Sequence, residues 1–127
     1  MTPSTNLLST LESYLKLTAT RGQTISANMA NIDTPGYRTR DIDFEAELQR
    51  ASTVAAGVAQ FDGGATKLSP AAHEVSGLME RPDGNNVNID RESLLLSQTQ
   101  LQYQIGVQLV KHQFHQILSA ISGGSQS

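Results

Sequence analysis

The sequence contains no cysteine and no tryptophan, and its 127 residues include only three tyrosines and three phenylalanines. The absence of cysteine excludes disulfide bonds, thiolate metal sites and a cysteine nucleophile. Charged residues make up 17% of the chain, below the roughly 25% that is typical of soluble domains. With so few large apolar side chains, a chain of this length can bury the contact lines between helices, but not a deep interior with a substrate pocket.

Long hydrophobic runs are also absent, because no segment approaches the ~20 apolar residues that span a bilayer. The first residues, MTPSTNLL, have neither a basic region nor an uninterrupted apolar region, so we expect no Sec-type signal peptide. A protein of this kind that leaves the cytoplasm needs another export route. The net charge of −3 gives no general attraction to nucleic acid or to an anionic membrane.

Acidic residues gather in the middle of the chain. Residues 41–87 hold eight acidic residues against three basic ones, whereas residues 88–127 hold two of each. An oligomer that stacks the ends of its subunits and turns their middle outward has this distribution of charge.

An apolar seam with alternating steps of three and four residues runs through the first part of the chain. Its apolar members are Leu8, Leu11, Leu15, Ile25, Met29 and Ile32. This spacing is typical of a coiled coil and predicts a helix over residues 1–33. Gly22 interrupts the seam, and we expect a bend or a close helix approach there. The turn residues Asp33-Thr34-Pro35-Gly36 end the helix, with Gly36 expected at positive φ in a type II turn.

A second and stronger seam occupies residues 88–123, where Asn88 or Asp90 can cap the start of a helix. Its apolar members are Ile89, Leu96, Tyr103, Val107, Val110, Phe114, Ile117 and Ile121, and a flanking apolar stripe consists of Leu94, Leu101, Ile105, Leu109 and Leu118. Because the two helices are matched in length, we expect them to form an antiparallel coiled-coil pair. The stripe makes the apolar face broader than one partner helix requires, so we assign the seam residues and the stripe to packing between subunits.

Between the two helices the sequence has no sustained periodicity. Residues 34–50 are expected to form a turn and an acidic segment, and residues 51–87 a flexible middle. At most a small β-hairpin forms there, for which Glu74–Met79 and Asn86–Ile89 are the candidate strands. The predicted fold class is therefore mainly α, in a single domain with an irregular middle segment.

Patterns that support catalysis or metal binding are incomplete. The acids between Asp41 and Glu47 lack the apolar cleft that glycoside cleavage needs, and a solvated acidic face explains them better. The stretch that begins at Asp83 lacks the central glycine and the final glutamate of a calcium-binding loop. His112 and His115 lie three residues apart, but the nearby chain offers no third metal ligand. We therefore expect no enzyme activity, no cofactor and no small-molecule substrate.

Residues 26–48, SANMANIDTPGYRTRDIDFEAEL, resemble the N-terminal signature of bacterial flagellar rod and hook axial proteins. The residues that carry the resemblance are Asn28, Asn31, Thr34, Pro35, Gly36, Tyr37, Asp41, Asp43 and Phe44. Together with the later segment GNNVNIDRE at 84–92, they are similar to the basal-body rod proteins that form the proximal rod.

The resemblance implies a structural subunit that self-assembles through its terminal helices into the shaft crossing the periplasm. It also implies export through the flagellar type III apparatus without a cleaved signal peptide. The implied partners are further copies of the chain, other rod proteins, and the adaptor that joins the rod to the membrane ring. Two alternatives stay open, which are another rod subunit of the same family and a soluble helical adaptor or chaperone that uses its helices in a discrete dimer.

Overall fold

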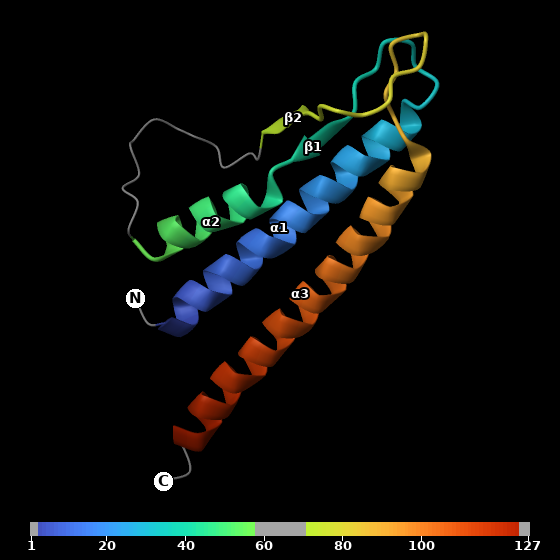
Figure 1. Ribbon diagram of the computed structural model, residues 1–127. Coiled ribbons are helices and arrows are strands. Elements are labelled where there is room, and N and C mark those ends of the chain that lie inside the picture. The colour runs from blue at the N-terminus through green and yellow to red at the C-terminus, as the bar shows by residue number, and fades with distance from the viewer. Residues whose placement is uncertain (1–2, 58–70, 125–127) are drawn as a thin grey trace.

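The computed structural model describes residues 3–57 and 71–124 and is mainly helical (Figure 1). Helix α1 spans Pro3–Ala30, helix α2 spans Phe44–Ala55 and helix α3 spans Ile89–Gly124. Two short strands, β1 (Arg40–Ile42) and β2 (Ala72–Glu74), pair antiparallel. The expected mainly helical class with two long terminal helices is confirmed. Part of the expected flexible middle, residues 58–70, lies outside the described residues.

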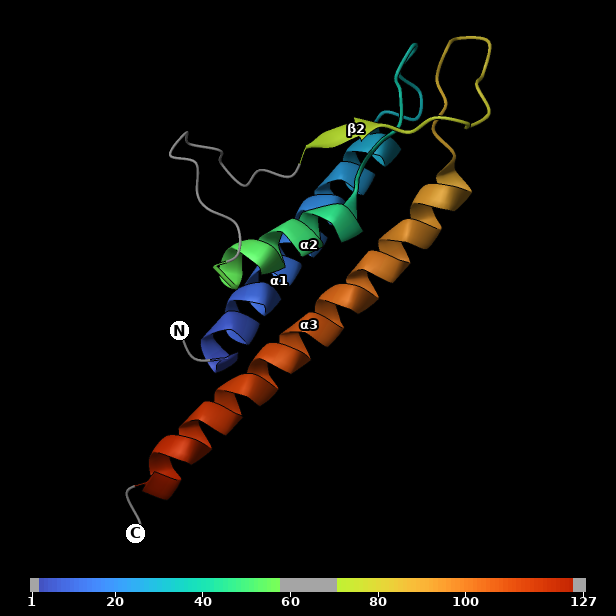
Figure 2. The ribbon, with the colours of Figure 1, turned by 60° about the vertical axis from the view of Figure 1, so that its left-hand side comes forward.

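Helix α1 lies between α2 and α3 (Figures 1 and 2). Helix α3 runs beside α1 in the opposite direction, and its last turns extend beyond the start of α1 in both views. The segments that connect the helices meet at the other end, where α1 ends and α3 begins. The molecule is therefore an elongated helix pair with one closed end and one open end.

Two contacts fix the register of α1 against α3. Near the closed end, Nδ2 of Asn28 lies 3.1 Å from Oε2 of Glu92. Further along, Gly106 lies against the side chains of Tyr14 and Leu15. Residues of the two helices are therefore opposite each other when their numbers add up to about 120, and the part of α3 after roughly residue 117 has no α1 residue opposite it.

The expectation of a turn and a flexible segment at residues 44–55 is wrong, because these residues form α2. The carboxylate of Asp43 accepts a hydrogen bond from the N–H of Ala46 at 3.3 Å and caps the helix. Glu45 and Glu47 occupy the first turn, where negative charge is favourable beside the helix N-terminus. The acids that suggest a solvated segment thus start a helix.

Aromatic packing fixes α2 on α1. The rings of Phe44 and Tyr14 meet edge to face with their centroids 5.5 Å apart. Such pairs contribute about 0.5–1.5 kcal/mol beyond the area that they bury. The pair holds the first residue of α2 against α1.

The hairpin expected between Glu74–Met79 and Asn86–Ile89 does not form. Strand β2 pairs instead with β1, with Asp41 opposite His73. The side-chain oxygen of Asn86 accepts a hydrogen bond from the N–H of Thr39 at 2.6 Å, and its own N–H donates to the backbone of the same connecting segment. The prediction is wrong because this asparagine bonds to the segment before β1 rather than to residues 74–79.

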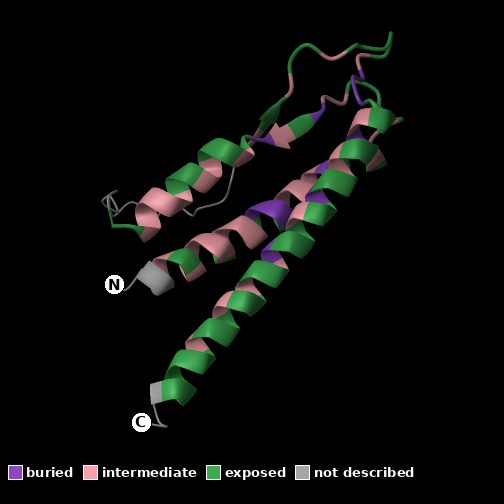
Figure 3. Cartoon of the chain, turned by 60° about the horizontal axis from the view of Figure 1, so that its bottom comes forward, coloured by how far each residue is buried: buried purple, intermediate pink, exposed green. Residues whose placement is uncertain are grey.

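Among the described residues, the buried ones are more often polar than apolar. The apolar ones are Leu17, Ile25, Ile42 and Val87, and the polar ones are Thr18, Asn28, Thr39, Asn85, Asn86, Glu92 and Thr99. Figure 3 shows that the last turns of α3 are largely exposed. The arrangement of the closed end therefore depends on hydrogen bonds between buried polar groups as well as on apolar packing.

The close helix approach expected at Gly22 is found at Gly106 instead. A Cβ atom at Gly106 would lie 2.7 Å from Cδ2 of Leu15 and 2.9 Å from Cδ1 of Tyr14. A Cβ atom at Gly22 would meet no described atom within 4 Å outside the adjacent backbone of its own helix. The absence of a side chain at Gly106 is therefore what lets α3 approach α1 closely at this point.

Gly106→Val is expected to lower the free energy of unfolding by about 1–3 kcal/mol, because overpacking pushes α3 away from α1. Gly22→Val is the matched control, since it makes the same change in helix propensity without a clash and should be neutral or slightly stabilising. Urea unfolding followed by far-ultraviolet circular dichroism measures both. An equal effect of the two substitutions would contradict the close approach at Gly106.

Candidate assembly interface

The strip of α3 that contacts α1 is only partly apolar. Glu92, Thr99 and Gly106 are buried along it and are spaced by seven residues, or two helical turns. The expected seam through Leu96 and Tyr103 lies to one side of this strip. Helix α3 is therefore turned about its own axis by about one residue, compared with a helix pair in which the expected seam is buried.

Two exposed apolar rows flank the strip. The seam row consists of Ile89, Tyr103, Phe114, Leu118 and Ile121, which are 42–67% exposed. The ridge consists of Leu94, Leu101, Ile105 and Leu109, which are 48–70% exposed. At about 100° per residue, the two rows lie on nearly opposite sides of α3. Both faces of the helix pair thus present unpartnered apolar side chains.

The apolar seam of α1 is better covered than that of α3. Ile25 is buried, and Leu8, Leu11, Leu15, Met29 and Ile32 are half-buried. On α3 the remaining seam residues Leu96, Val107, Val110 and Ile117 are half-buried as well. The residues that remain free for packing against other chains are therefore concentrated on α3.

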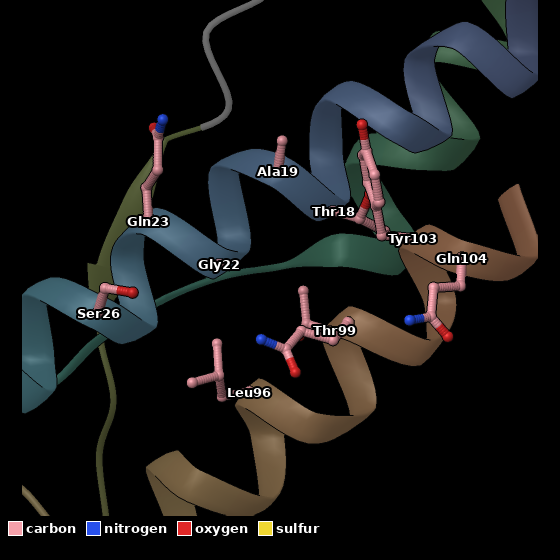
Figure 4. Close-up of a pocket in the computed structure, with 10 residues that line it drawn as sticks. Thr18, Ala19, Gly22, Gln23, Ser26, Leu96, Thr99, Tyr103 and Gln104 are labelled. Carbon is pink, nitrogen blue, oxygen red and sulfur yellow. The ribbon is translucent and has the colours of Figure 1, made fainter. Parts of the chain in front are cut away.

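A groove of about 790 Å³ runs between α1 and α3 on the side of the seam row (Figure 4). Its walls include Thr18, Gly22 and Ser26 of α1, and Leu96, Thr99 and Tyr103 of α3. None of the residues that line it carries a formal charge. The Oγ1 atom of Thr99 is buried there without a hydrogen-bond partner among the described residues.

Asn28 is the centre of a buried polar junction at the closed end of the pair. Its Oδ1 accepts hydrogen bonds from the hydroxyl of Tyr37 at 3.0 Å and from the N–H of Arg40 at 3.1 Å. Its Nδ2 donates to the carbonyl of Arg40 at 2.8 Å and to the carboxylate of Glu92 at 3.1 Å. One side chain thus joins α1, the segment that enters β1 and the start of α3.

Two neighbouring asparagines extend the junction. The Nδ2 of Asn85 donates to the carbonyls of Asn31, Ile32 and Thr34 at 2.8–3.1 Å, which satisfies backbone acceptors just after the end of α1. Three residues further along, Asn88 caps α3 by accepting hydrogen bonds from two backbone N–H groups of its first turn. The expected cap at Asn88 is confirmed.

The turn at Pro35-Gly36 is confirmed in its main feature. The N–H of Tyr37 donates to the carbonyl of Thr34 at 3.2 Å, and Gly36 has φ of 74°. The N–H of Gly36 also donates to the carbonyl of Asp83 at 2.9 Å. A second glycine, Gly84 with φ of 86°, packs against the Cα of Gly36. The two turns therefore lock the connecting segments together, backbone against backbone.

A cluster of charges lies beside Asn28. The guanidinium of Arg21 binds both carboxylate oxygens of Asp41 at 3.1 Å, and Arg91 lies 3.7 Å from the same carboxylate. Arg91 also pairs with the fully buried Glu92 at 2.7 Å. Since α1, β1 and α3 each contribute a partner, the cluster holds three elements in one relative position.

Burial raises the pKa of the Tyr37 phenol above its ordinary value, while Arg40 lowers it and Glu92 raises it. The phenol therefore keeps its proton at neutral pH and can donate its hydrogen bond to Asn28. The role of this motif residue is structural.

Features that support other chemistry are few in the described part of the chain. No group of three or more His, Cys, Asp or Glu side chains there is placed to hold a metal ion. His112 and His115 are both exposed on α3. Among the described helices, none is both long enough and apolar enough to cross a membrane.

The structure brings most of the motif residues together. Asn28, Tyr37 and Asp41 meet in the junction, Thr34, Pro35 and Gly36 form the adjoining turn, and Asp43 and Phe44 start α2. Asn31 donates to Ala27 and accepts from Thr34 at the end of α1. Asn85 and Glu92 lie in the segment 84–92 that shares the resemblance, but the sequence does not predict their roles, because their partners are more than 50 residues away.

The amino-acid sequence of the chain is similar to those of known proteins. The family model for flagella basal body rod proteins matches residues 8–38, which cover most of α1 and the turn after it. The flagellar basal body rod protein FlgB of Salmonella typhimurium strain LT2 is 32% identical over 125 residues, which are 87% of this chain and 89% of that protein. FlgB of Escherichia coli strain K12 is 33% identical over 123 residues with the same coverage. FlgB of Cereibacter sphaeroides is 33% identical over 122 residues.

Proposed function

Because the chain belongs to the family of flagellar basal body rod proteins that includes FlgB, we propose that it acts as a structural subunit of the flagellar rod. The near full-length matches favour this function over a soluble adaptor or chaperone and over a different rod subunit. The family is structural rather than enzymatic, and its members belong to the basal body.

The observation that carries the proposal is the pair of apolar rows on opposite faces of α3. The ridge and the seam row are both exposed, whereas monomeric soluble proteins rarely expose contiguous apolar rows of this length. Neighbouring subunits cover them in the assembled rod. In this proposal, α1 and α3 act as an antiparallel coiled-coil pair, supported by their opposite directions and by the contacts at Asn28 and Gly106.

The family also suggests where the subunit lies and which proteins it contacts. We place the subunit in the proximal, periplasmic part of the rod, after export by the flagellar type III apparatus without a cleaved signal peptide. Its partners are further copies of itself, other rod proteins and the adaptor at the membrane ring. The similarity to FlgB supports the choice of the proximal rod.

Gly36→Val is expected to abolish motility, because a β-branched residue at φ near 74° is strained and disturbs the turn that orients the connecting segments. The protein should be made but be absent from purified basal bodies. Cells without the native gene, complemented with each variant, are compared for swimming and for rod content. Ala30→Val, an exposed position with helical backbone, is the control and should restore motility. Normal motility with Gly36→Val would remove the turn from the assembly mechanism.

A further inference from the structure

The two exposed faces of the α1–α3 pair differ in shape. One face carries the groove between the helices, lined by Gly22 and Tyr103 among others (Figure 4). The other face carries the ridge. We propose that the ridge of one copy docks into the groove of the next copy. The proposal rests on the proposed function and names the two surfaces that meet in the rod.

The spacing of the ridge fits the groove. Leu101, Ile105 and Leu109 follow one another at intervals of four residues, which is the row that packs between the rows of a neighbouring helix. On α1 the groove is lined mostly by small residues, with Gln23 as the exception, and a Cβ atom at Gly22 would meet no described atom within 4 Å outside the adjacent backbone of its own helix. A helix can therefore approach α1 closely at this point.

Charge also favours a second copy as the occupant. Between Ser93 and Gly124 the only residue of α3 with a formal charge is Lys111, and the residues that line the groove have none. A charged partner would lose its hydration in such a groove without gaining an ion pair. The ridge of α3 brings only uncharged leucine and isoleucine side chains.

The placement of the surfaces fixes the symmetry of the contact. Groove and ridge lie on nearly opposite sides of α3, so a copy that offers its ridge to one neighbour still has a free groove for another. Such a heterologous contact repeats as a ring or a filament, whereas two grooves or two ridges facing each other form a closed dimer. The contact therefore extends an assembly, as a rod requires.

Cysteine cross-linking tests the contact directly, because the chain has no native cysteine. One copy carries Gly22→Cys, and a second copy carries Leu101→Cys, Ile105→Cys or Leu109→Cys in turn. The two copies are expressed together in cells without the native gene, and isolated basal bodies are oxidised. Because the two cysteines are in different chains, a mixed disulfide reports contact between copies. Ala27→Cys, on the same helix outside the groove, and His115→Cys, outside the ridge, are the matched controls.

For at least one ridge position we expect about tenfold more mixed disulfide than for either control, since a disulfide needs Cα atoms within about 7 Å. Each single variant alone should give no disulfide-linked dimer. Dimers of Gly22→Cys alone, or of one ridge variant alone, would show a closed contact and overturn the proposal. Mixed disulfide no greater than in the controls, with the protein present in basal bodies, would also overturn it and leave the proposed function intact. Absence of the wild-type chain from basal bodies would instead overturn the proposed function.

Discussion

Replacing Leu101 and Leu109 together with aspartate is expected to leave the protein able to be made and exported but unable to enter the rod. Both side chains belong to the ridge and are about half exposed, so the isolated chain tolerates the change. Burial of one leucine contributes about 1.5–3 kcal/mol, repeated at every contact between subunits, and a buried unpaired carboxylate adds a further cost. The measurement is to block later flagellar assembly and to quantify the variant in the periplasm and in isolated basal bodies.

The control for this variant carries the same two added charges elsewhere on α3. Ser97→Asp with Gln108→Asp changes exposed, uncharged residues outside both the ridge and the groove, and it should be incorporated normally. Efficient incorporation of the ridge variant into the rod would contradict the proposed packing of the ridge between subunits. Equal exclusion of both variants would show that net charge, rather than the ridge, controls assembly.

Asn28→Asp is expected to destabilise the isolated chain by about 3–5 kcal/mol, a large part of the stability of a small domain. The substitution removes the amide donor that binds Glu92 and the carbonyl of Arg40, and it places a second carboxylate about 3 Å from a buried one. Thermal unfolding followed by circular dichroism should show a fall in Tm of more than about 10 °C.

Exchanging the amide and the carboxylate between positions 28 and 92 tests whether the contact between them causes the loss of stability. Adding Glu92→Gln to Asn28→Asp restores one carboxylate and one amide at the same contact, so the double variant should regain a substantial part of the lost stability. The bond to the carbonyl of Arg40 stays lost, so recovery is incomplete. A double variant as unstable as Asn28→Asp would show that the contact with Glu92 is not the cause of the loss.

The two long helices can be predicted from the sequence because their periodicity is averaged over many residues. The spacing of three and four residues persists through about 30 positions at each end, so single exceptions do not hide it. The rotation of α3 cannot be predicted in this way. It depends on the buried contact of Glu92 with Asn28 and on the missing side chain at Gly106, and neither adds to an apolar pattern.

The structure of the middle of the chain, in contrast to the two long helices, is not predicted from the sequence. A signal for α2 exists in the sequence, because Asp43 followed by Glu45 and Glu47 is typical of a helix start, but the polar composition hides it. The pairing of β1 with β2 and the bonding of Asn86 join residues that are 30 or more positions apart. Local patterns carry no information on such partners. The motif residues were identified from the resemblance, and only the structure gives the bonds that Asn28 makes.

The polar junction closes only one end of the α1–α3 pair, and this gives the subunit an uneven mechanical character. A force that slides α3 along α1 must break the bond between Asn28 and Glu92 and pull Arg91 of α3 away from Asp41, which Arg21 of α1 holds in place. A force that spreads the opposite ends meets mainly half-buried side chains, and α3 continues there without α1 beside it. The helix pair is thus stiff at its closed end and more compliant at its open end. Under torque, we expect a shaft built from such subunits to keep its shape at the closed ends and to deform at the open ends.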